Sequence, residues 1–499
     1  MRVIVVESGG LAPQADADAL SEIENVGVSR ELNQSLVRPR GLGGASQIWT
    51  GRCAPFDEVD YARRPWVPHS GWPIGSHEID PYLDRSAAHL GLGIGRGFTE
   101  AGPPRRFKRS PAGNVMDGSL VLPFFWQFST DAMRRYDSMR FGKRILQGTS
   151  DNVRVFLNAS VVQIDAGPTV NSARGVEIVG PDGARRTIAA PVVVLCAGGI
   201  ENARLLLASN KVAASGLGNG HDLVGRFLMD HPRGGVATFD HRRVNALGDH
   251  FGLNFLGTGQ GSYLFCRGLR LSPQVQEREG LLNCAVWLSE IVTHDDPWSA
   301  LQRILRRRGT QVRRDAMAIA SNLGLVVKGM YRGVSGQVIP RKLARLELNC
   351  TVEQLPDPES RITLSDRVDR HGTPISRVNW CVNDREQQTV RRTAELVAQE
   401  CTRIGVPAPV LDDWVRDKAP FPPSFGEVAH HIGTTRMADS PGEGVVDRYC
   451  QVHGIRGLYI AGSSVFPTAG HANPTQMIVA LGVRLADTIK QRAKSAHAA

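Results

Sequence analysis

The sequence lacks the patterns that mark several common classes of protein. Its eight cysteines are scattered, with no CxxC pair and no Cys/His grouping at the spacing of zinc ligands. This distribution predicts reduced thiols in a cytoplasmic protein and no bound metal ion. The opening residues, MRVIVVESGG, hold too short an apolar run for a signal peptide or a membrane span.

Acidic residues and aromatic residues are also in short supply. The 59 basic residues outnumber the 49 acidic ones by ten, a mild excess over 499 residues, and aromatic residues make up 6%. Part of this excess is an arginine run, but no aromatic residues alternate with it to stack on bases, so nucleic-acid binding is not expected. A solvated helix face or a subunit contact is expected instead. The run comprises Arg303, Arg306, Arg307, Arg308, Arg313 and Arg314.

The composition that remains, 41% apolar and 22% charged residues, is that of a globular protein too long for a single hydrophobic core. Two domains are therefore expected. Short apolar segments at residues 3–6, 192–196 and 458–461 end in turns, as buried parallel strands do. Helical patterns follow the second and third of them, at residues 200–209 and from residue 474. These units predict an α/β fold with a Rossmann-like domain.

A different pattern runs from about residue 250 to 400. Alternating residues in SRITLSD (360–366) indicate a half-buried strand, and residues 386–404 indicate an amphipathic helix. This region predicts a second domain built on a mostly antiparallel sheet and helices. The segment NVRVFLNASVVQID (152–165) also alternates and predicts a pair of half-buried strands.

The last predicted helix has strong local signals. Asn473 is a good N-cap, and Pro474 suits the first helical position. The positive end of this helix can stabilise a negative charge through its backbone amides. Four apolar residues fall on one helical face: Met477, Leu481, Leu485 and Ile489.

Several specific motifs are spread along the chain. They are VIVVESGG (3–10), RPRGLGGASQIWTGRCAPFD (38–57), PWVPHSGWPI (65–74), LCAGGIENARLLLAS (195–209), VGRFLMDHP (224–232), HHIGTTRM (430–437) and AGSSVFPTAGHANPT (461–475). These motifs resemble the glucose-methanol-choline (GMC) family of flavin oxidoreductases, most closely its pyranose oxidase and glucoside 3-dehydrogenase branch. The resemblance implies a Rossmann-like FAD-binding domain and a substrate domain.

The resemblance also implies a reaction, the oxidation of a hydroxyl (CH–OH) of a sugar or glycoside by hydride transfer to the N5 atom of FAD. Such chemistry needs a base for the hydroxyl proton, and a histidine can serve because its pKa lies near the working pH. The catalytic pair of the family matches His430 and Asn473. A sterol or a simple alcohol is the alternative substrate, and the electron acceptor is left open.

Three residues near this pair leave alternatives. In an extended segment the side chains of His430 and His431 point to opposite faces, so only one can face the flavin, and motif position favours His430. Asn473 is also explained by its capping role. His471 could contact the substrate, but we expect an exposed loop histidine there.

Further residues are expected around the cofactor. Small residues at positions 43–46 let the backbone pass close to FAD. Thr50 matches a threonine near flavin N5, and Ile48 stands where some pyranose oxidases bind the flavin covalently through a histidine, so non-covalent FAD is expected. For Val162 and Gly198, ordinary packing is an equally good explanation. The full set is Glu7, Gly43, Gly44, Ser46, Thr50, Val162, Gly198, Gly462, Ser463, Pro474 and Thr475.

The FAD-binding domain is expected to be N-terminally incomplete. A Rossmann unit places a strand and a GxGxxG turn roughly 20 residues before the acid that binds the ribose, here Glu7, although a solvated turn residue is as common at such a place. The chain contains no GxGxxG sequence. We expect translation to start roughly 30 residues upstream, where an export signal could also lie. An inactive remnant or an interaction subunit is the alternative.

The expected FAD-binding domain is discontinuous and comprises residues 1–60, 150–240 and 425–499. The substrate-binding domain and connecting segments comprise residues 61–149 and 241–424. The protein is expected to act on a small-molecule alcohol or sugar, to bind neither nucleic acid nor a membrane, and to be able to form homo-oligomers.

Overall fold

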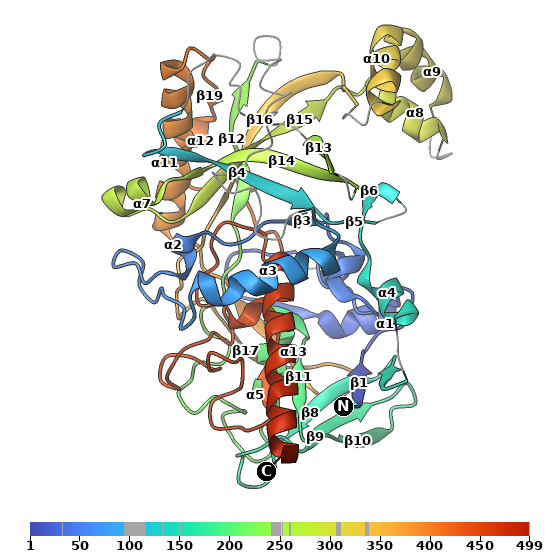
Figure 1. Ribbon diagram of the computed structural model, residues 1–499, viewed down its shortest axis with the longest axis vertical. Coiled ribbons are helices and arrows are strands. Elements are labelled where there is room, and N and C mark those ends of the chain that lie inside the picture. The colour runs from blue at the N-terminus through green and yellow to red at the C-terminus, as the bar shows by residue number, and fades with distance from the viewer. Residues whose placement is uncertain are drawn as a thin grey trace.

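Two regions make up the computed structural model: a lower one around the long C-terminal helix and an upper one built on a large sheet (Figure 1). In the described part of the chain, no helix has the length and apolar character needed to cross a membrane. The structure describes residues 1–31, 33–93, 116–131, 134–148, 151–240, 251, 253–258, 261–305, 311–334 and 339–498.

The lower region contains two separate pairs of parallel strands. Strand β1 (Val3–Val6) pairs with β7 (Val153–Phe156), and β11 (Val193–Leu195) pairs with β20 (Leu458–Ile460). Helix α5 (Gly198–Ala208) follows β11 directly. Helix α13 (Thr475–Ala498) comes after β20 and packs on α3 (Ser76–Leu90). The strand, turn and helix units predicted at these places are therefore present.

Two small sheets complete this region. One comprises β8 (Ser160–Asp165), β9 (Gly175–Val179) and β10 (Arg185–Ala189); the other comprises β2 (Ile23–Asn25), β17 (Arg361–Val368) and β18 (Pro374–Asn379). The predicted strand pair at residues 152–165 exists as β7 and β8, but the two strands belong to different sheets. The residues of each strand alternate in burial because one face of each strand is covered, and the covering neighbours differ between the two strands.

The upper region is an eight-stranded sheet in which every strand pairs antiparallel to its neighbours. Its order is β19-β12-β16-β15-β14-β4-β3, with β13 on β14. The strands are β3 (Arg52–Cys53), β4 (Val121–Phe128), β12 (Arg233–Phe239), β13 (Leu253–Thr258), β14 (Gly261–Leu271), β15 (Cys284–Val292), β16 (Leu343–Val352) and β19 (Val410–Leu411).

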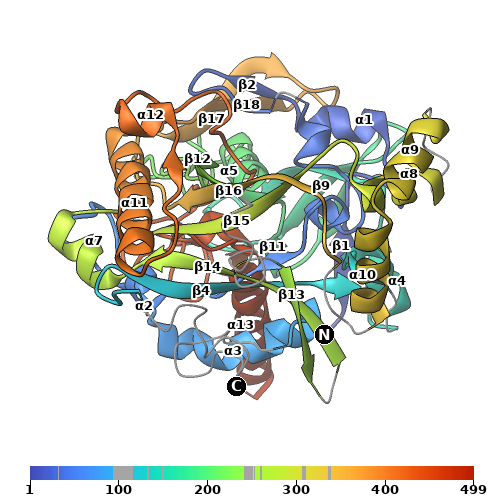
Figure 2. The ribbon, with the colours of Figure 1, turned by 90° about the horizontal axis from the view of Figure 1, so that it is seen from above.

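Helix α11 (Asp384–Arg403) packs on β15 and β16, close to its predicted bounds (Figure 2). At the other end of the sheet, three helices form a separate group (Figure 1), in which Arg303 is paired with Asp315 at 2.5 Å. Residues 306–308 of the arginine run lie outside the described residues. The remaining elements are α1 (Ala15–Asp18), α2 (Glu58–Tyr61), β5 (Thr130–Asp131), β6 (Arg134–Ser138), α4 (Phe141–Gln147), α7 (Pro273–Glu279), α8 (Pro297–Leu305), α9 (Val312–Ala320), α10 (Leu323–Val334) and α12 (Asp413–Arg416).

Helix α13 begins at Thr475, one residue later than predicted. The backbone N–H of Ile478 donates to the carbonyl oxygen of Pro474 at 2.9 Å, which puts Pro474 rather than Asn473 at the N-cap. The Asn473 side chain is thereby free for other contacts. The predicted apolar face is confirmed, because Met477, Leu481, Leu485 and Ile489 are all buried in the core.

Strand β1 departs from the prediction of a buried strand. Val3 is 42% exposed and Ile4 is 46% exposed, and on β11 the side chain of Val194 is 37% exposed. A parallel strand in a Rossmann-type sheet is normally buried because other elements cover both faces of the sheet, whereas Val3, Ile4 and Val194 line an open cavity. Among the described strands, β1 pairs only with β7 and β11 only with β20, so one edge of each stays open.

The exposure of β1 predicts that the same substitution, Ile to Ala, costs less stability in β1 than in β20. Replacing Ile460 by Ala, a fully buried position in β20, should lower the free energy of unfolding by about 2 to 5 kcal/mol. Replacing the half-exposed Ile4 by Ala should cost less than about 1 kcal/mol. Denaturant unfolding of both variants measures the difference. Equal losses would contradict the exposure of β1 and mean that the Ile4 side chain is buried.

Candidate functional site

A cavity of about 2370 Å³ lies between the open strand edges and the histidines of residues 430–431. Its wall includes all of residues 1–8 and all of residues 190–199. Ten of the thirteen site residues predicted from the sequence line it. They are Glu7, Gly43, Gly44, Thr50, Gly198, His430, Ser463, Asn473, Pro474 and Thr475.

The other three predicted residues do not line this cavity. The Ser46 hydroxyl donates to the carbonyl oxygen of Gly43 at 2.6 Å, so it closes the turn that carries the glycines. Val162 is buried in the core, and its neighbour Val161 faces the cavity instead. Gly462 has φ of 119°, a conformation that glycine adopts without strain.

The glycines and Glu7 shape the wall through the backbone. Gly43 has φ of 100°, and a Cβ there would come within 2.6 Å of the backbone nitrogen of Gly142. Gly198 has φ of 86° and open space where a Cβ would lie, at the start of α5. The Glu7 carboxylate accepts from the backbone N–H of Gly9 at 2.8 Å, so it also stabilises its own turn.

His430 lies at the centre of a chain of side chains on the cavity wall. Its Nδ1 is 2.8 Å from Nδ1 of His231, and its Nε2 is 3.4 Å from Nδ2 of Asn473. His431 instead lies beside the carboxylates of Asp230 and Glu427. The neighbouring histidines therefore contact different groups, and His430 is the one in contact with Asn473.

The hydrogen bonds determine which ring nitrogens carry protons. Nε2 of His231 is 2.9 Å from the carbonyl oxygen of Gly470, and a carbonyl can only accept, so this nitrogen is protonated. Burial lowers the pKa of His231, which leaves its Nδ1 as an acceptor. Nδ1 of His430 must then carry a proton and donate to it. The lone pair of His430 is consequently on Nε2, beside Asn473.

Asp230 holds both histidine segments in place. Its Oδ1 accepts from the backbone N–H groups of His231 at 2.7 Å, His430 at 3.1 Å and Val428 at 3.2 Å. Its Oδ2 accepts from Arg30 at 2.8 Å. Between the anchored nitrogens, Ala429 has φ of 59°, a conformation that costs energy for a residue with a Cβ. The carboxylate therefore holds a strained turn next to His430.

Opposing effects set the charges in this cluster. Burial favours a higher pKa for Asp230, but Arg30, the neighbouring histidines and backbone donors hold that pKa well below its usual range. Burial lowers the pKa of His430 to about 3; the nearby His231, Arg233 and Arg52 act in the same direction, and the Asp230 carboxylate acts in the opposite one. At neutral pH, Asp230 is ionised and His430 is neutral.

The sequence analysis missed four residues here: Arg52 and Arg233, which line the cavity, and Asp230 and His231, which are buried and contact the His430 segment. All lie within or beside motifs that it recognised, since VGRFLMDHP ends with Asp230, His231 and a proline, and Arg52 follows the glycine-rich turn. An Asp-His pair in a buried motif is a usable signal for a histidine network. The contact between His231 and His430, 199 residues apart, exists only in the fold.

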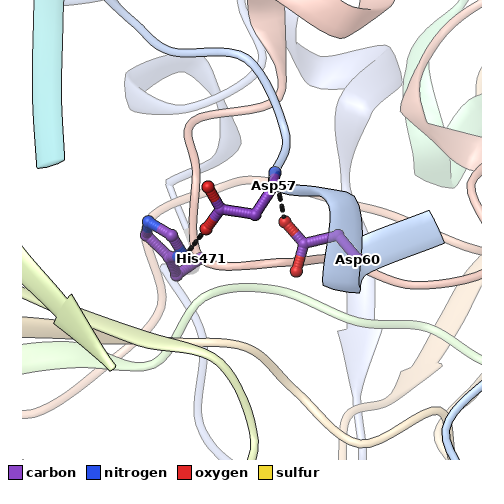
Figure 3. A group of neighbouring side chains, drawn as sticks. All are labelled: Asp57, Asp60 and His471. Atoms are coloured by element: carbon purple, nitrogen blue, oxygen red, sulfur yellow. Dashed lines mark hydrogen bonds and ion pairs between the residues drawn. The ribbon is translucent and has the colours of Figure 1, made fainter. Parts of the chain in front are cut away.

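A second buried cluster joins Asp57, Asp60 and His471 (Figure 3). The prediction of an exposed loop histidine at position 471 is wrong, because the side chain is 1% exposed and packs against Phe124. Burial and nearby charges raise the pKa of Asp60 to about 8. The carboxylates already have cationic and amide partners, so these contacts compete with a metal ion. Asn283 donates to Asp60 at 2.8 Å, and Arg270 pairs with Asp57 at 3.2 Å.

The depressed pKa of His430 predicts a dependence of stability on acid. Between pH 6.5 and about 3, the unfolded chain binds a proton at His430 and the folded protein does not, so stability falls as pH falls. The variant His430→Gln should lose stability less steeply over that range. Unfolding temperatures measured from pH 7 to pH 4 test this, and parallel curves for the two proteins would contradict it.

Comparisons with known proteins match one family model and several oxidoreductases. Residues 356–482 match the family model described as GMC oxidoreductase. Fructose dehydrogenase large subunit from Gluconobacter japonicus is 26% identical over 64% of this chain and 51% of its own length. C-glycoside 3-oxidase from Arthrobacter globiformis is 32% identical over 32% of this chain and 29% of its own length. The chain thus spans about half, or less, of these two relatives.

Other matches extend over most of the chain. The 2-methyl-1,2-propanediol dehydrogenase of Mycolicibacterium austroafricanum is 24% identical over 90% of this chain and 81% of its own length. A formate oxidase structure covers 99% of the chain with a TM-score of 0.56 and 16% identity, and the chain covers 94% of it. Pyridoxine 4-oxidase from Mesorbium loti gives a TM-score of 0.54 at 15% identity, with 98% and 94% of the two chains covered.

The structural matches show a shared fold over nearly the whole chain, and the family match covers the segment from just after β16 to the first third of α13. Together these findings show that residues 356–482 match the GMC oxidoreductase family and that the chain has the fold of the oxidases it resembles.

Proposed function

We propose that this protein oxidises a hydroxyl of a sugar or glycoside to a carbonyl with bound FAD, and that His430 is the base. The observation that carries the proposal is the unprotonated Nε2 of His430 on the cavity wall, 3.4 Å from the Asn473 amide. Names of relatives support the substrate class, since one is a fructose dehydrogenase subunit and another a C-glycoside 3-oxidase.

The residues present fit FAD over most of the cavity. The glycine turn at 43–44 offers backbone without side chains, and the N-termini of α5 and α13 both reach the wall. Ile48 offers only an apolar side chain there, which fits non-covalent binding. A Rossmann unit would place its diphosphate turn between β1 and β11, and the described residues supply no strand there.

The side chains of the wall can perform the proton transfer. A hydroxyl bound between His430 and Asn473 would donate to Nε2 of His430 and accept from Nδ2 of Asn473. His231 holds the His430 ring by accepting from its Nδ1. The start of α13 offers backbone N–H groups toward developing negative charge. FAD, when bound, supplies the acceptor for the hydride.

A simple alcohol is the second candidate substrate. The Mycolicibacterium relative, which matches 90% of this chain, is named as a dehydrogenase of a branched diol. Reduction of the flavin by a panel of sugars, glycosides, diols and sterols separates these candidates. The electron acceptor and the expected homo-oligomer stay predictions.

The role of His430 predicts a large and selective loss of activity. His430→Gln should lower the rate of flavin reduction about 100-fold to 10,000-fold, because a glutamine amide cannot accept the proton. Asn473→Ala should give a smaller loss of about tenfold to 100-fold, as one hydrogen bond to the substrate disappears. Stopped-flow absorbance near about 450 nm, the flavin band, measures both rates.

The matched control is His221→Gln, which replaces an exposed histidine outside the cavity and should leave the rate unchanged. Flavin content must be equal in all the proteins compared. Retention of the rate within about threefold in His430→Gln would remove His430 as the base.

The open edge between β1 and β11 predicts how flavin binding responds to an added strand. A protein extended at its N-terminus by the in-frame upstream codons should bind FAD more tightly than the 499-residue chain if those codons encode a strand and a GxGxxG turn. Titration with FAD, followed by absorbance, measures both affinities. Equal affinity of the two proteins would show that the open edge is not where the diphosphate binds.

A further inference from the structure

Two arginines border the cavity beside His430. Arg52 is the first residue of β3, and Arg233 is the first residue of β12, two positions after His231. Both guanidinium groups lie over the ring of Trp287, with Cζ 4.8 Å and 4.6 Å from its centre. Arg52 also lies 5.2 Å from the ring centre of Trp126. Aromatic rings therefore hold both cations in place.

Neither arginine has an acidic partner in the part of the chain that the structure describes. Other arginines around the cavity do, since Arg38 and Arg40 share the carboxylate of Glu201 at 3.1 Å and 2.9 Å. In the described part of the chain, the guanidinium groups of Arg52 and Arg233 contact aromatic rings. Their side chains are partly exposed, and both residues are part of the cavity wall.

Two positive charges on a partly buried cavity wall are unfavourable when no anion neutralises them. Burial lowers the pKa of Arg52, and burial together with Arg52 lowers the pKa of Arg233 to about 10. A guanidinium group in a protein stays charged at neutral pH, and ion pairing would normally compensate for the burial of such a charge. Their field also opposes protonation of His430. An anion bound between them would relieve both effects.

We propose that the substrate carries an anionic group, a carboxylate or a phosphate, which Arg52 and Arg233 bind while its hydroxyl lies at His430. This deepens the proposed function and rests on His430 being the reacting end of the cavity. Guanidinium groups suit both anions because each can donate two parallel hydrogen bonds. The substrate class is then a sugar acid or a sugar phosphate rather than a neutral sugar.

Three sugars that differ only at carbon 6 test the proposal on the FAD-loaded protein: glucose, glucuronate and glucose 6-phosphate. At least one of the two anionic sugars should be preferred over glucose by about tenfold or more in kcat/KM. Comparing glucuronate with glucose 6-phosphate then shows whether the site prefers a carboxylate or a phosphate. Arg233→Gln and Arg52→Gln should each remove about tenfold or more of that preference. Arg233→Lys, which keeps the charge, should remove less.

The matched control is Arg267→Gln, which removes an arginine that also lies over aromatic rings but does not line the cavity. It should leave the preference unchanged. Calorimetric binding of the same three sugars gives a second readout that does not depend on turnover. If an anionic sugar binds more tightly than glucose and Arg233→Gln removes the difference, the anion site is supported. If in addition no sugar reduces the flavin, that second result counts against the proposed function and not against the anion site.

Two results would overturn the anion site. One is equal or better binding and turnover of glucose. The other is a pair of arginine variants that lower FAD affinity or shift the flavin spectrum but keep the anion preference, since the arginines would then serve the cofactor.

Discussion

The geometry around His430 depends on one buried carboxylate. Asp230 is fully buried, and it joins two chain segments almost 200 residues apart by accepting from backbone N–H groups on both. Arg30, which lies 4.8 Å from the ring centre of Trp380, neutralises it. A carboxylate buried without such partners would cost several kcal/mol, roughly the net stability of many domains. The ion pair therefore fixes the distance between His231 and His430.

This fixed distance determines which ring nitrogens of His231 and His430 carry protons. Carbonyl oxygens at residues 469–470 require a proton on Nε2 of His231, and this requirement passes through the 2.8 Å contact to leave the lone pair of His430 on Nε2. A base with a pKa of about 3 is weak in this state. An anion at Arg52 and Arg233 would raise that pKa, so substrate binding and base strength would be linked.

Local signals carried much of the fold and of the site. The apolar face of α13, the strands near residues 3, 193 and 458, and the cavity positions of His430 and Asn473 all follow from short segments of sequence. The helix face and the strands depend on periodicity and turn residues within a few neighbours, whereas His430 and Asn473 were assigned from the family resemblance. The division into two domains stays a prediction, although the antiparallel sheet includes β12, which lies inside the segment assigned to the FAD-binding domain.

Features set by long-range packing could not be read from the sequence. The burial of His471 results from packing against Phe124, more than 300 residues away, and the exposure of Val3 and Ile4 on β1 results from the cavity that they line. The start of α13 depends on which carbonyl oxygen accepts the first helical hydrogen bond, and that oxygen belongs to Pro474. Partners distant in sequence decide the burial of His471 and the role of His231, whereas the start of α13 is set by a local hydrogen bond.

The proposed chemistry requires that neutral His430 carries its proton on Nδ1 and presents an unprotonated Nε2 to the cavity. Neutron diffraction at neutral pH locates these protons directly. We expect deuterium on Nδ1 of His430 and on Nε2 of His231, with none on Nε2 of His430. Deuterium on Nε2 of His430 would contradict it, because that nitrogen could then accept no proton from a substrate hydroxyl.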